Sequence, residues 1–281
     1  MTPPTEAPAK APDGAVQARA PDGAGPAGWR LVHRPVVDST QAVARTLLEA
    51  GEGSPVWPDG ALVVQADEQT GGRGRHGRPW TSPPGNLYVT VALPCPEGPR
   101  VGVQIGFLGG VALAEALGQL GFEDRARLKW PNDLLLDQAK VAGLLPESAR
   151  DSDDRTWVLL GMGVNVATAP PPDAVLYPTT TLNAHGLGVL APEDLLPPLL
   201  TRLAEGVRRW RAEGFAPVRA AWRRHGHGVG DPVRVRLGAE TVTGVFAGLA
   251  ADGALMIRDP GGAMRTILAG DVFFPARQGD A

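Results

Sequence analysis

The sequence has almost none of the residues that mark an exported or membrane-embedded protein. It contains a single cysteine, Cys95, among 281 residues, which excludes an intramolecular disulfide and a cysteine-cluster metal site. No apolar run reaches the roughly 18 residues of a membrane span, and the most apolar stretch, 101–120, is interrupted by Gln104, Glu115 and Gln119. The opening residues also lack the apolar region of a secretory signal. We therefore predict a cytoplasmic chain with no membrane segment, in which Cys95 is a buried apolar residue.

Several catalytic and metal signatures are missing as well. The five histidines show neither His-Glu-x-x-His nor another tight metal-ligand spacing, so we predict no zinc site. There is no Gly-x-Ser-x-Gly elbow of a serine hydrolase and no Gly-Lys-Ser/Thr of an NTPase phosphate loop. The formal net charge is −3 and the sequence pI is about 6.0, which argues against a nucleic-acid-binding module.

The chain is rich in glycine and proline, with 37 and 28 residues, and part of this excess lies at the N-terminus. Residues 1–28 hold mostly Ala, Pro and Gly with no aromatic residue, so we predict a disordered tail that is too short for a DNA-binding helix-turn-helix. The length suits one to two domains. We expect a catalytic domain at 29–229, a small β domain at 230–275 and a tail at 276–281.

Apolar alternation and helical spacing predict a mixed sheet flanked by helices, an α/β fold of the α+β type, because the strands do not repeat as βαβ units. The expected strands are 61–66, 86–93, 134–136, 141–145 and 157–166. Helices are expected directly after Asp38-Ser39-Thr40, whose side chains are candidate caps, at 101–120, and from Pro197-Pro198, since proline suits a first turn. Four alternating runs after Gly230 predict a small antiparallel barrel.

Residues 71–78, GGRGRHGR, combine four glycines with three arginines. Exposed backbone amides and guanidinium groups together are typical of a site for phosphate or carboxylate. A solvated basic loop and a flexible RNA-binding segment are the alternatives from composition alone. The position between two strands, directly before Pro79-Trp80, favours a loop held in place. Because its like charges repel, we predict a mobile loop that becomes ordered when an anion binds.

Residues 129–133, KWPND, place a cation, an aromatic ring and a carboxylate before a predicted hairpin, and Lys140 follows its turn. Alternation places Lys140 on the same face as Ala142, pointing into a pocket floored by small residues, where an ammonium can stabilise developing negative charge. Asp133 is a candidate Mg²⁺ ligand. Each of these residues alone also fits a surface ion pair or a turn. Asn165, in an apolar strand, is either a satisfied core amide or a ligand contact.

Together these segments resemble the biotin protein ligase family, in the family's order and approximate spacing over about residues 30–275. The matching residues are DST at 38–40, QTGGRGRHGRPW at 69–80, GNLY at 85–88, KWPND at 129–133, Lys140 with Ala142-Gly143, and GMGVN at 161–165. The nearest rival is the lipoate or octanoate ligase family, which shares the catalytic fold. The Gly-Arg-Gly-Arg-x-Gly-Arg series and the C-terminal barrel favour biotin.

The resemblance implies a class II synthetase-like catalytic core with a Src-homology-3-like C-terminal barrel. It also implies a two-step reaction with ATP and Mg²⁺, in which biotin becomes biotinyl-5′-AMP and is then transferred to a lysine of a biotin carrier protein such as the acetyl-CoA carboxylase subunit. The short N-terminal tail places the chain among family members without a DNA-binding domain. The resemblance leaves a monomer and a homodimer both open.

The resemblance also assigns roles to single residues. Lys140 and Arg75 are the expected catalytic residues, and Asp133 the expected Mg²⁺ ligand. The expected biotin contacts are Ser39, Thr40, Gln41, Gln69, Arg73, Gly74, Arg75, Lys140 and Gly143, and the expected nucleotide contacts are Arg78, Trp80, Asn132 and Asn165.

The chain departs from the family pattern at three positions. Gln41 stands where asparagine is common, and His76 interrupts the arginine series. Pro146 lacks a backbone donor, so we expect the strand of Lys140 to bulge or end early.

Overall fold

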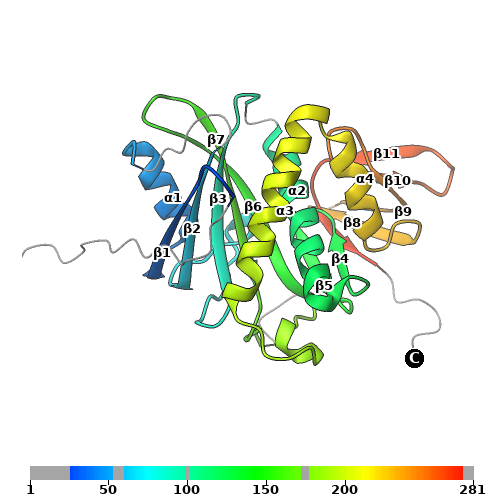
Figure 1. Cartoon of the computed structure of the whole chain (residues 1–281). Helices are drawn as coiled ribbons and strands as arrows, with labels where there is room; N and C mark the ends of the chain where they lie inside the picture. The colour runs from blue at the N-terminus through cyan, green and yellow to red at the C-terminus, as the bar shows by residue number, and fades with distance from the viewer. Residues whose placement is uncertain (1–25, 53–59, 99–100, 172–176, 239, 275–281) are drawn as a thin grey trace, which may run out of the picture.

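The computed structural model describes residues 26–52, 60–98, 101–171, 177–238 and 240–274, which form two sheets and four α-helices (Figure 1). Most of the predicted tail at 1–28, and all of the tail at 276–281, lie outside these residues. The first sheet consists of β1 (Trp29–Val37), β2 (Ala61–Gln69), β3 (Leu87–Pro94), β4 (Ala126–Lys129), β5 (Asp133–Leu136), β6 (Ala139–Arg150) and β7 (Thr156–Val164). The second consists of β8 (Pro232–Leu237), β9 (Glu240–Leu249), β10 (Leu255–Arg258), β11 (Met264–Ile267) and β12 (Asp271–Phe273). The helices are α1 (Thr40–Glu49), α2 (Gly102–Leu117), α3 (Pro192–Glu213) and α4 (Ala216–His225).

The first sheet is mixed, as the sequence predicts, and its strands lie in the order β1-β2-β3-β7-β6-β5-β4. Only β1 and β2 are parallel, and α1 connects them; the other neighbours are antiparallel. Successive residues of β2 point to opposite faces of the sheet. Leu62 and Val64 pack with Leu48 of α1, whereas Val63 belongs to the larger cluster that contains residues of α2. The two faces are therefore covered by different helices, with α2 and α3 together on one side (Figure 1).

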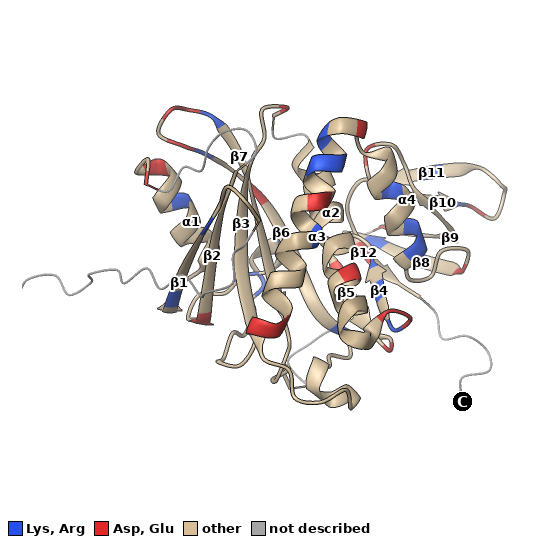
Figure 2. Cartoon of the chain, viewed as in Figure 1, with Lys and Arg blue, Asp and Glu red and all other residues tan. Residues whose placement is uncertain are grey.

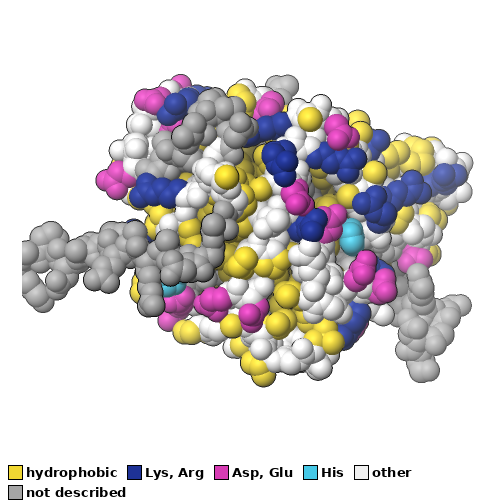
Figure 3. Space-filling view, in the orientation of Figure 1, with side chains coloured by type: hydrophobic (Ala, Val, Ile, Leu, Met, Phe, Trp, Pro, Cys, Tyr) yellow, Lys and Arg dark blue, Asp and Glu magenta, His cyan; other side chains and the backbone are white. Residues whose placement is uncertain are grey.

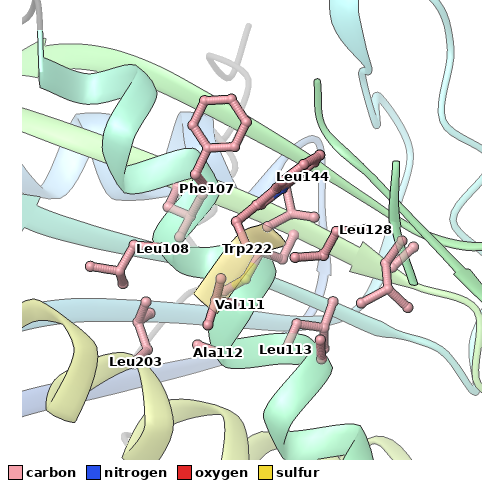
Figure 4. Close-up of a cluster of buried hydrophobic side chains, with 14 of the residues drawn as sticks. Phe107, Leu108, Val111, Ala112, Leu113, Leu128, Leu144, Leu203 and Trp222 are labelled. Atoms are coloured by element: carbon pink, nitrogen blue, oxygen red, sulfur yellow. The ribbon is translucent and has the colours of Figure 1, made fainter. Parts of the chain in front are cut away.

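Helix α2 is the centre of the larger hydrophobic cluster (Figure 4). Phe107, Leu108 and Val111 are buried, and Leu203 of α3 and Trp222 of α4 belong to the same cluster. With the π turn that follows it, the segment Gly102–Phe122 is the one helix in the described residues that is long and apolar enough to cross a membrane. However, 67% of its most apolar window is buried inside the protein, as expected of a core helix.

The five-stranded sheet is antiparallel, with the order β11-β10-β9-β8-β12. Alternating runs predict four of its strands; β12 has only three residues, which are too few to show alternation. The sheet joins the core of the first sheet: the ring of Trp222 lies 6.0 Å from that of Phe107 and 6.0 Å from that of Phe246 in β9. One hydrophobic cluster therefore runs through both sheets, and the domain boundary at 229/230 remains a prediction.

Helix α3 begins at Pro192, earlier than predicted, so the expectation of a start at Pro197-Pro198 is wrong. Pro192 occupies the first turn, and the Asp194 carboxylate accepts a hydrogen bond from the Ala191 backbone N–H at 2.8 Å, which caps the N-terminus. Pro197 and Pro198 then lie inside the helix. The apolar face that α3 packs against α2 compensates for the backbone hydrogen bonds that these prolines cannot make.

Strand β6 does not end at Pro146, and its one bulge against β5 lies five residues earlier, at Val141, so the expected effect of Pro146 is wrong. The β6–β7 register is continuous from Ala142 to Arg150, and Pro146 pairs with Leu160. Strand β5 pairs with β6 only as far as Gly143, so β6 has β7 as its one strand neighbour at Pro146. Proline is tolerated there because a strand with one free side can lack an N–H directed to that side.

Charged residues lie mainly on helices, loops and strand ends; α3 carries both signs, whereas the charged side chains of α4 are all basic (Figure 2). On the face drawn in Figure 3, basic and acidic side chains are interspersed among apolar ones. This pattern agrees with the small net charge of −3.

Asp151, between β6 and β7, is a buried carboxylate with several donors. It accepts hydrogen bonds from Trp157 Nε1 at 2.9 Å, from Arg155 Nε at 2.8 Å, and from two backbone N–H groups. Burial alone would raise the pKa of Asp151, but the hydrogen bonds from Trp157 and Arg155 outweigh it and lower this pKa.

We predict that Asp151→Asn lowers the free energy of unfolding at pH 7 by about 2–3 kcal/mol, because the amide cannot accept all of these bonds. Chemical denaturation measures this, with Asp124→Asn at an exposed turn as the control. A carboxyl with a lowered folded pKa contributes stability above its unfolded pKa and loses it as the pH falls through the folded pKa. The difference in the free energy of unfolding between wild type and Asp151→Asn should therefore shrink below about pH 4. If Asp151→Asn and Asp124→Asn are equally stable at pH 7, the Asp151 carboxylate does not stabilise the fold in this way.

Candidate active site

One cavity of about 450 Å³ lies where β6, β7, the start of α1, the loop at 71–78 and β12 meet. Every residue that the sequence singles out as a site residue lines it. These are Ser39, Thr40, Gln41, Gln69, Arg73, Gly74, Arg75, Arg78, Trp80, Asn132, Asp133, Lys140, Gly143 and Asn165. The structure thus brings these residues together, and the ligand that each one contacts remains a prediction. A cavity of this size can hold a ligand of a few hundred daltons.

Glycines on β6 and β7 make room for the Trp80 ring. A Cβ atom on Gly163 would lie 2.6 Å from Trp80 Nε1, and one on Gly143 would lie 3.1 Å from the ring. The indole therefore packs directly against the sheet backbone, where any larger residue would displace it. Trp80 Nε1 is buried and, among the residues that the structure describes, has no hydrogen-bond partner.

The wall beside α1 is a network of hydroxyl and amide groups. Gln69 Oε1 accepts hydrogen bonds from the Thr40 backbone N–H at 2.9 Å and from Thr40 Oγ1 at 3.2 Å, and Gln69 Nε2 donates to Ser82 Oγ at 3.1 Å. Ser39 occupies the N-cap position, but its side chain makes no capping hydrogen bond, so the predicted capping role is wrong for Ser39. Its hydroxyl instead lines the cavity. Such groups suit a neutral polar ligand.

Gln41 fixes the start of α1 to the sheet. Its Nε2 donates to the carbonyl oxygen of Leu145 at 3.0 Å and to that of Leu159 at 3.3 Å, and so bridges β6 and β7. Its side chain lies over Gly161, where a Cβ atom would be 2.8 Å from Gln41 Cδ. Gly161, like Gly143 and Gly163, thus lets a side chain reach the backbone of the sheet.

The loop at 71–78 is held as a narrow turn. The Trp80 N–H donates to the Gly72 carbonyl at 2.9 Å, and the Gly74 N–H donates to the Arg78 carbonyl at 2.7 Å. Between them His76 adopts a positive φ of 58°. These bonds agree with the expectation of a loop held in place; ordering on anion binding remains a prediction.

Two arginines of this loop reach distant parts of the chain. Arg75 Nη1 lies 3.4 Å from Asn132 Oδ1, and burial lowers the pKa of Arg75 although Asp271 opposes the effect. Arg78 Nη2 lies 3.3 Å from a carboxylate oxygen of Asp271 in β12. The loop is therefore connected to both sheets.

Lys140 points into the cavity, as predicted, but for a different reason. A β-bulge shifts the β5–β6 register, so that Leu134 pairs with Ala142 while Leu135 pairs with Lys140. Ala142 is buried in the cluster around α2, whereas Lys140 Cε would be 3.5 Å from a Cβ atom on Gly143. The predicted shared face of Lys140 and Ala142 is wrong, because the bulge interrupts strict alternation. Lys140 Nζ forms an ion pair of 2.6 Å with Asp133 Oδ1.

The cavity also contains residues that the sequence does not single out as site residues. Lys129 lies within the KWPND segment, but nothing in the sequence shows that it faces the cavity. Tyr177 lies in a segment without periodicity, and Asp271 lies in the short β12. For Asn165, the sequence leaves a satisfied core amide and a ligand contact as alternatives, and the structure fits both. Its Nδ2 donates to the Thr180 carbonyl at 3.2 Å, and the residue also lines the cavity.

The lining holds five Lys and Arg side chains against two carboxylates, Asp133 and Asp271, so the cavity favours anions. No group of three or more metal-binding side chains occurs in the part of the chain that the structure describes. One or two carboxylates do fit a magnesium ion that is held chiefly by phosphate oxygens. The arrangement thus combines a neutral polar end with a cationic end suited to phosphate or carboxylate.

Comparisons with known proteins point to one family. The Biotin/lipoate A/B protein ligase family matches residues 34–165, and the biotin protein ligase C-terminal domain matches residues 228–274. The biotin--[acetyl-CoA-carboxylase] ligase of Paracoccus denitrificans is 38% identical over 245 residues, covering 84% of this chain and 97% of the relative. The enzyme of that name from Mycobacterium tuberculosis is 33% identical, and the match covers 89% of this chain and 91% of that enzyme. The biotin protein ligase of Aquifex aeolicus, solved with biotin and ATP, superposes with a TM-score of 0.72 at 29% identity, over 88% of this chain and 99% of that one.

We predict that Gly163→Ala displaces Trp80, because the new methyl would occupy the position of its indole nitrogen. The indole N–H resonance of Trp80, assigned with Trp80→Phe, should shift, and the free energy of unfolding should fall by about 1–3 kcal/mol. Gly118→Ala is the control, since its methyl would make only ordinary contacts of 3.6 Å with Glu123. An unmoved Trp80 resonance would show that the glycine is not required for this contact.

Proposed function

Since the chain belongs to the biotin protein ligase family, we propose that it joins biotin to a lysine of a biotin carrier protein such as that of acetyl-CoA carboxylase, with ATP as the energy source. The observation that carries this proposal is that one cavity combines a polar wall at α1 with a cationic cluster around Lys140. The polar wall suits the neutral ring system of biotin, and the cationic cluster suits its carboxylate and the phosphates of ATP.

In the first step, an oxygen of the biotin carboxylate attacks the α-phosphorus of ATP. The new bond joins that oxygen to phosphorus, the bond from the α-phosphorus to the α–β bridging oxygen breaks, and pyrophosphate leaves with the electron pair. Negative charge grows on the phosphoryl oxygens and on the leaving group. We assign the stabilisation of that charge to Lys140 and Arg75, which both line the cavity, and the ion pair with Asp133 orients the Lys140 ammonium.

In the second step, the amine of the carrier lysine attacks the carbonyl carbon of biotinyl-5′-AMP. The C–N bond forms, the C–O bond to AMP breaks, and the amine loses a proton as the amide is completed. AMP is a good leaving group, which is why the carboxylate is activated first. We assign Arg73, Gly74 and Arg75 to the loop that covers the biotin adenylate, Trp80 to the adenine, and Arg78, Asn132 and Asn165 to the nucleotide pocket.

Magnesium enters this scheme with ATP. The donor set fits, since Asp133 keeps one carboxylate oxygen outside its contact with Lys140. The ion would neutralise phosphate charge, while the residues of the chain bind and orient the two substrates.

The remaining expectations concern compartment and partners. We keep the cytoplasm as the expected location, with support from Cys95, which is a free buried thiol. Action without direct DNA contact also remains a proposal. For a homodimer, β1 as an outer strand of the sheet offers free backbone groups for a contact.

The first test is to incubate the purified protein with biotin, ATP and Mg²⁺ and to analyse the products by mass spectrometry. We expect biotinyl-5′-AMP, followed by transfer to a carrier lysine when the carrier is added. Adenylation of lipoate or octanoate with no reaction of biotin would overturn the proposal in favour of the sister family.

We predict that Lys140→Ala lowers the rate of adenylate formation by about 100-fold or more, because it removes one cation from the reacting phosphate. Pyrophosphate release in single-turnover experiments measures the rate, and circular dichroism checks the fold. Arg258→Ala, at an exposed position on β10, is the control for loss of a positive charge. An unchanged rate of pyrophosphate release would refute the assignment of Lys140.

A further inference from the structure

Lys129 is a buried cation that the proposed mechanism does not use. It ends β4, is 8% exposed and lines the cavity. Its Nζ lies 3.5 Å from the centre of the Tyr177 ring. Within the residues that the structure describes, no carboxylate forms an ion pair with Lys129. A buried ammonium is therefore held by an aromatic face and not by an opposite charge.

The nearby carboxylates are already engaged with other cations. Asp133 pairs with Lys140 at 2.6 Å, and Asp271 lies 3.3 Å from Arg78 and 3.2 Å from Arg236. The charge of Lys129 is thus left without direct neutralisation, although Asp133 and Asp271 are close enough to influence it.

Tyr177 is itself held in place by the C-terminal sheet. Its ring lies 5.6 Å from that of Phe273 in β12, at an interplanar angle of 42°. Arg234 and Arg236 lie over Phe273 at 5.6 Å and 5.4 Å. The Tyr177 ring that faces the Lys129 ammonium is therefore supported by a tilted ring contact with Phe273.

This arrangement has an energetic cost that a purely structural role would not explain. Burial lowers the pKa of Lys129, and Lys140 adds to that effect while Asp133 opposes it. A cation–π contact offsets part of the desolvation without cancelling the charge. Buried charges of this kind are found where a ligand completes the site.

We propose that Lys129 is a further phosphate-binding residue of this cavity, and that Tyr177 is the positioning residue that holds its ammonium ready for the phosphates of ATP. The aromatic ring fixes the position of the Lys129 ammonium without neutralising its charge. A paired carboxylate would neutralise that charge, which an anionic ligand needs for binding. This inference rests on the proposed function for the identity of the nucleotide. The phosphate-binding role itself is measurable without the reaction.

The test compares binding of α,β-methylene-ATP and of adenosine by calorimetry. We expect Lys129→Met to weaken binding of the triphosphate analogue by about 10- to 100-fold, the value of one charge-assisted contact, with adenosine binding within about twofold of wild type. Arg258→Met is the matched control for removal of an exposed positive charge. If Lys129→Met binds the analogue as wild type does, the inference is wrong.

Variants of Tyr177 separate positioning from packing. Tyr177→Phe keeps the aromatic face and should bind the analogue within about twofold of wild type, whereas Tyr177→Leu should weaken binding by about 3- to 30-fold. In the Lys129→Met background, Tyr177→Leu should have no further effect, because Tyr177 acts through Lys129. Additive effects, or equal losses in Phe and Leu variants, would overturn the positioning role. Should Lys129→Met fail to fold, Lys129→Gln replaces it in the cycle.

The outcomes also separate this inference from the proposed function. If wild type forms biotinyl-5′-AMP and the variants bind the analogue normally, only the inference about Lys129 fails. If wild type adenylates no biotin, the proposed function fails, and the loss of triphosphate binding in Lys129→Met still decides the phosphate-binding role.

Discussion

The contact between Trp80 and the bare backbone of β6 and β7 is the constraint on which the cavity depends. Gly143 and Gly163 provide the space, and the hydrogen-bonded turn at 72–80 brings the indole to it. Because the sheet has no side chains at these points, the floor of the site is main chain and one face of an aromatic ring. The cationic loop on the other side of Trp80 is thereby anchored at its end while its arginines extend over the cavity.

A second constraint is the distribution of charge around that floor. Asp133 on β5 pairs with Lys140, and Asp271 on β12 pairs with Arg78 and Arg236. Without them, the five Lys and Arg side chains of the lining would repel one another; with them, the cavity keeps a net positive character that an anionic substrate can neutralise. The two sheets are therefore joined by apolar packing through Trp222 and by ion pairs at the site.

Sequence patterns predict the sheet class, most strands and all the expected cavity residues, because motifs of glycine, arginine and lysine specify local chemistry directly. They fail where tertiary contacts decide. The start of α3 depends on Asp194 and on packing against α2, which outweigh the local preference of Pro197. The direction of Lys140 depends on a bulge that no alternation rule shows. Tyr177 and Asp271 are distant in sequence from every motif, and only the fold brings them to the cavity.

The lining of the cavity extends along the chain from Ser39 to Val272, and its last contribution comes from the three-residue strand β12. That strand exists only through pairing with β8, and its Val272 is buried in the common core. During synthesis, Asp271 and Val272 are the last lining residues to leave the ribosome, whereas Asp133, Lys140 and the loop at 71–78 are made earlier. The cavity therefore reaches its full lining, including the carboxylate that pairs with Arg78, only after β12 has been added and paired with β8.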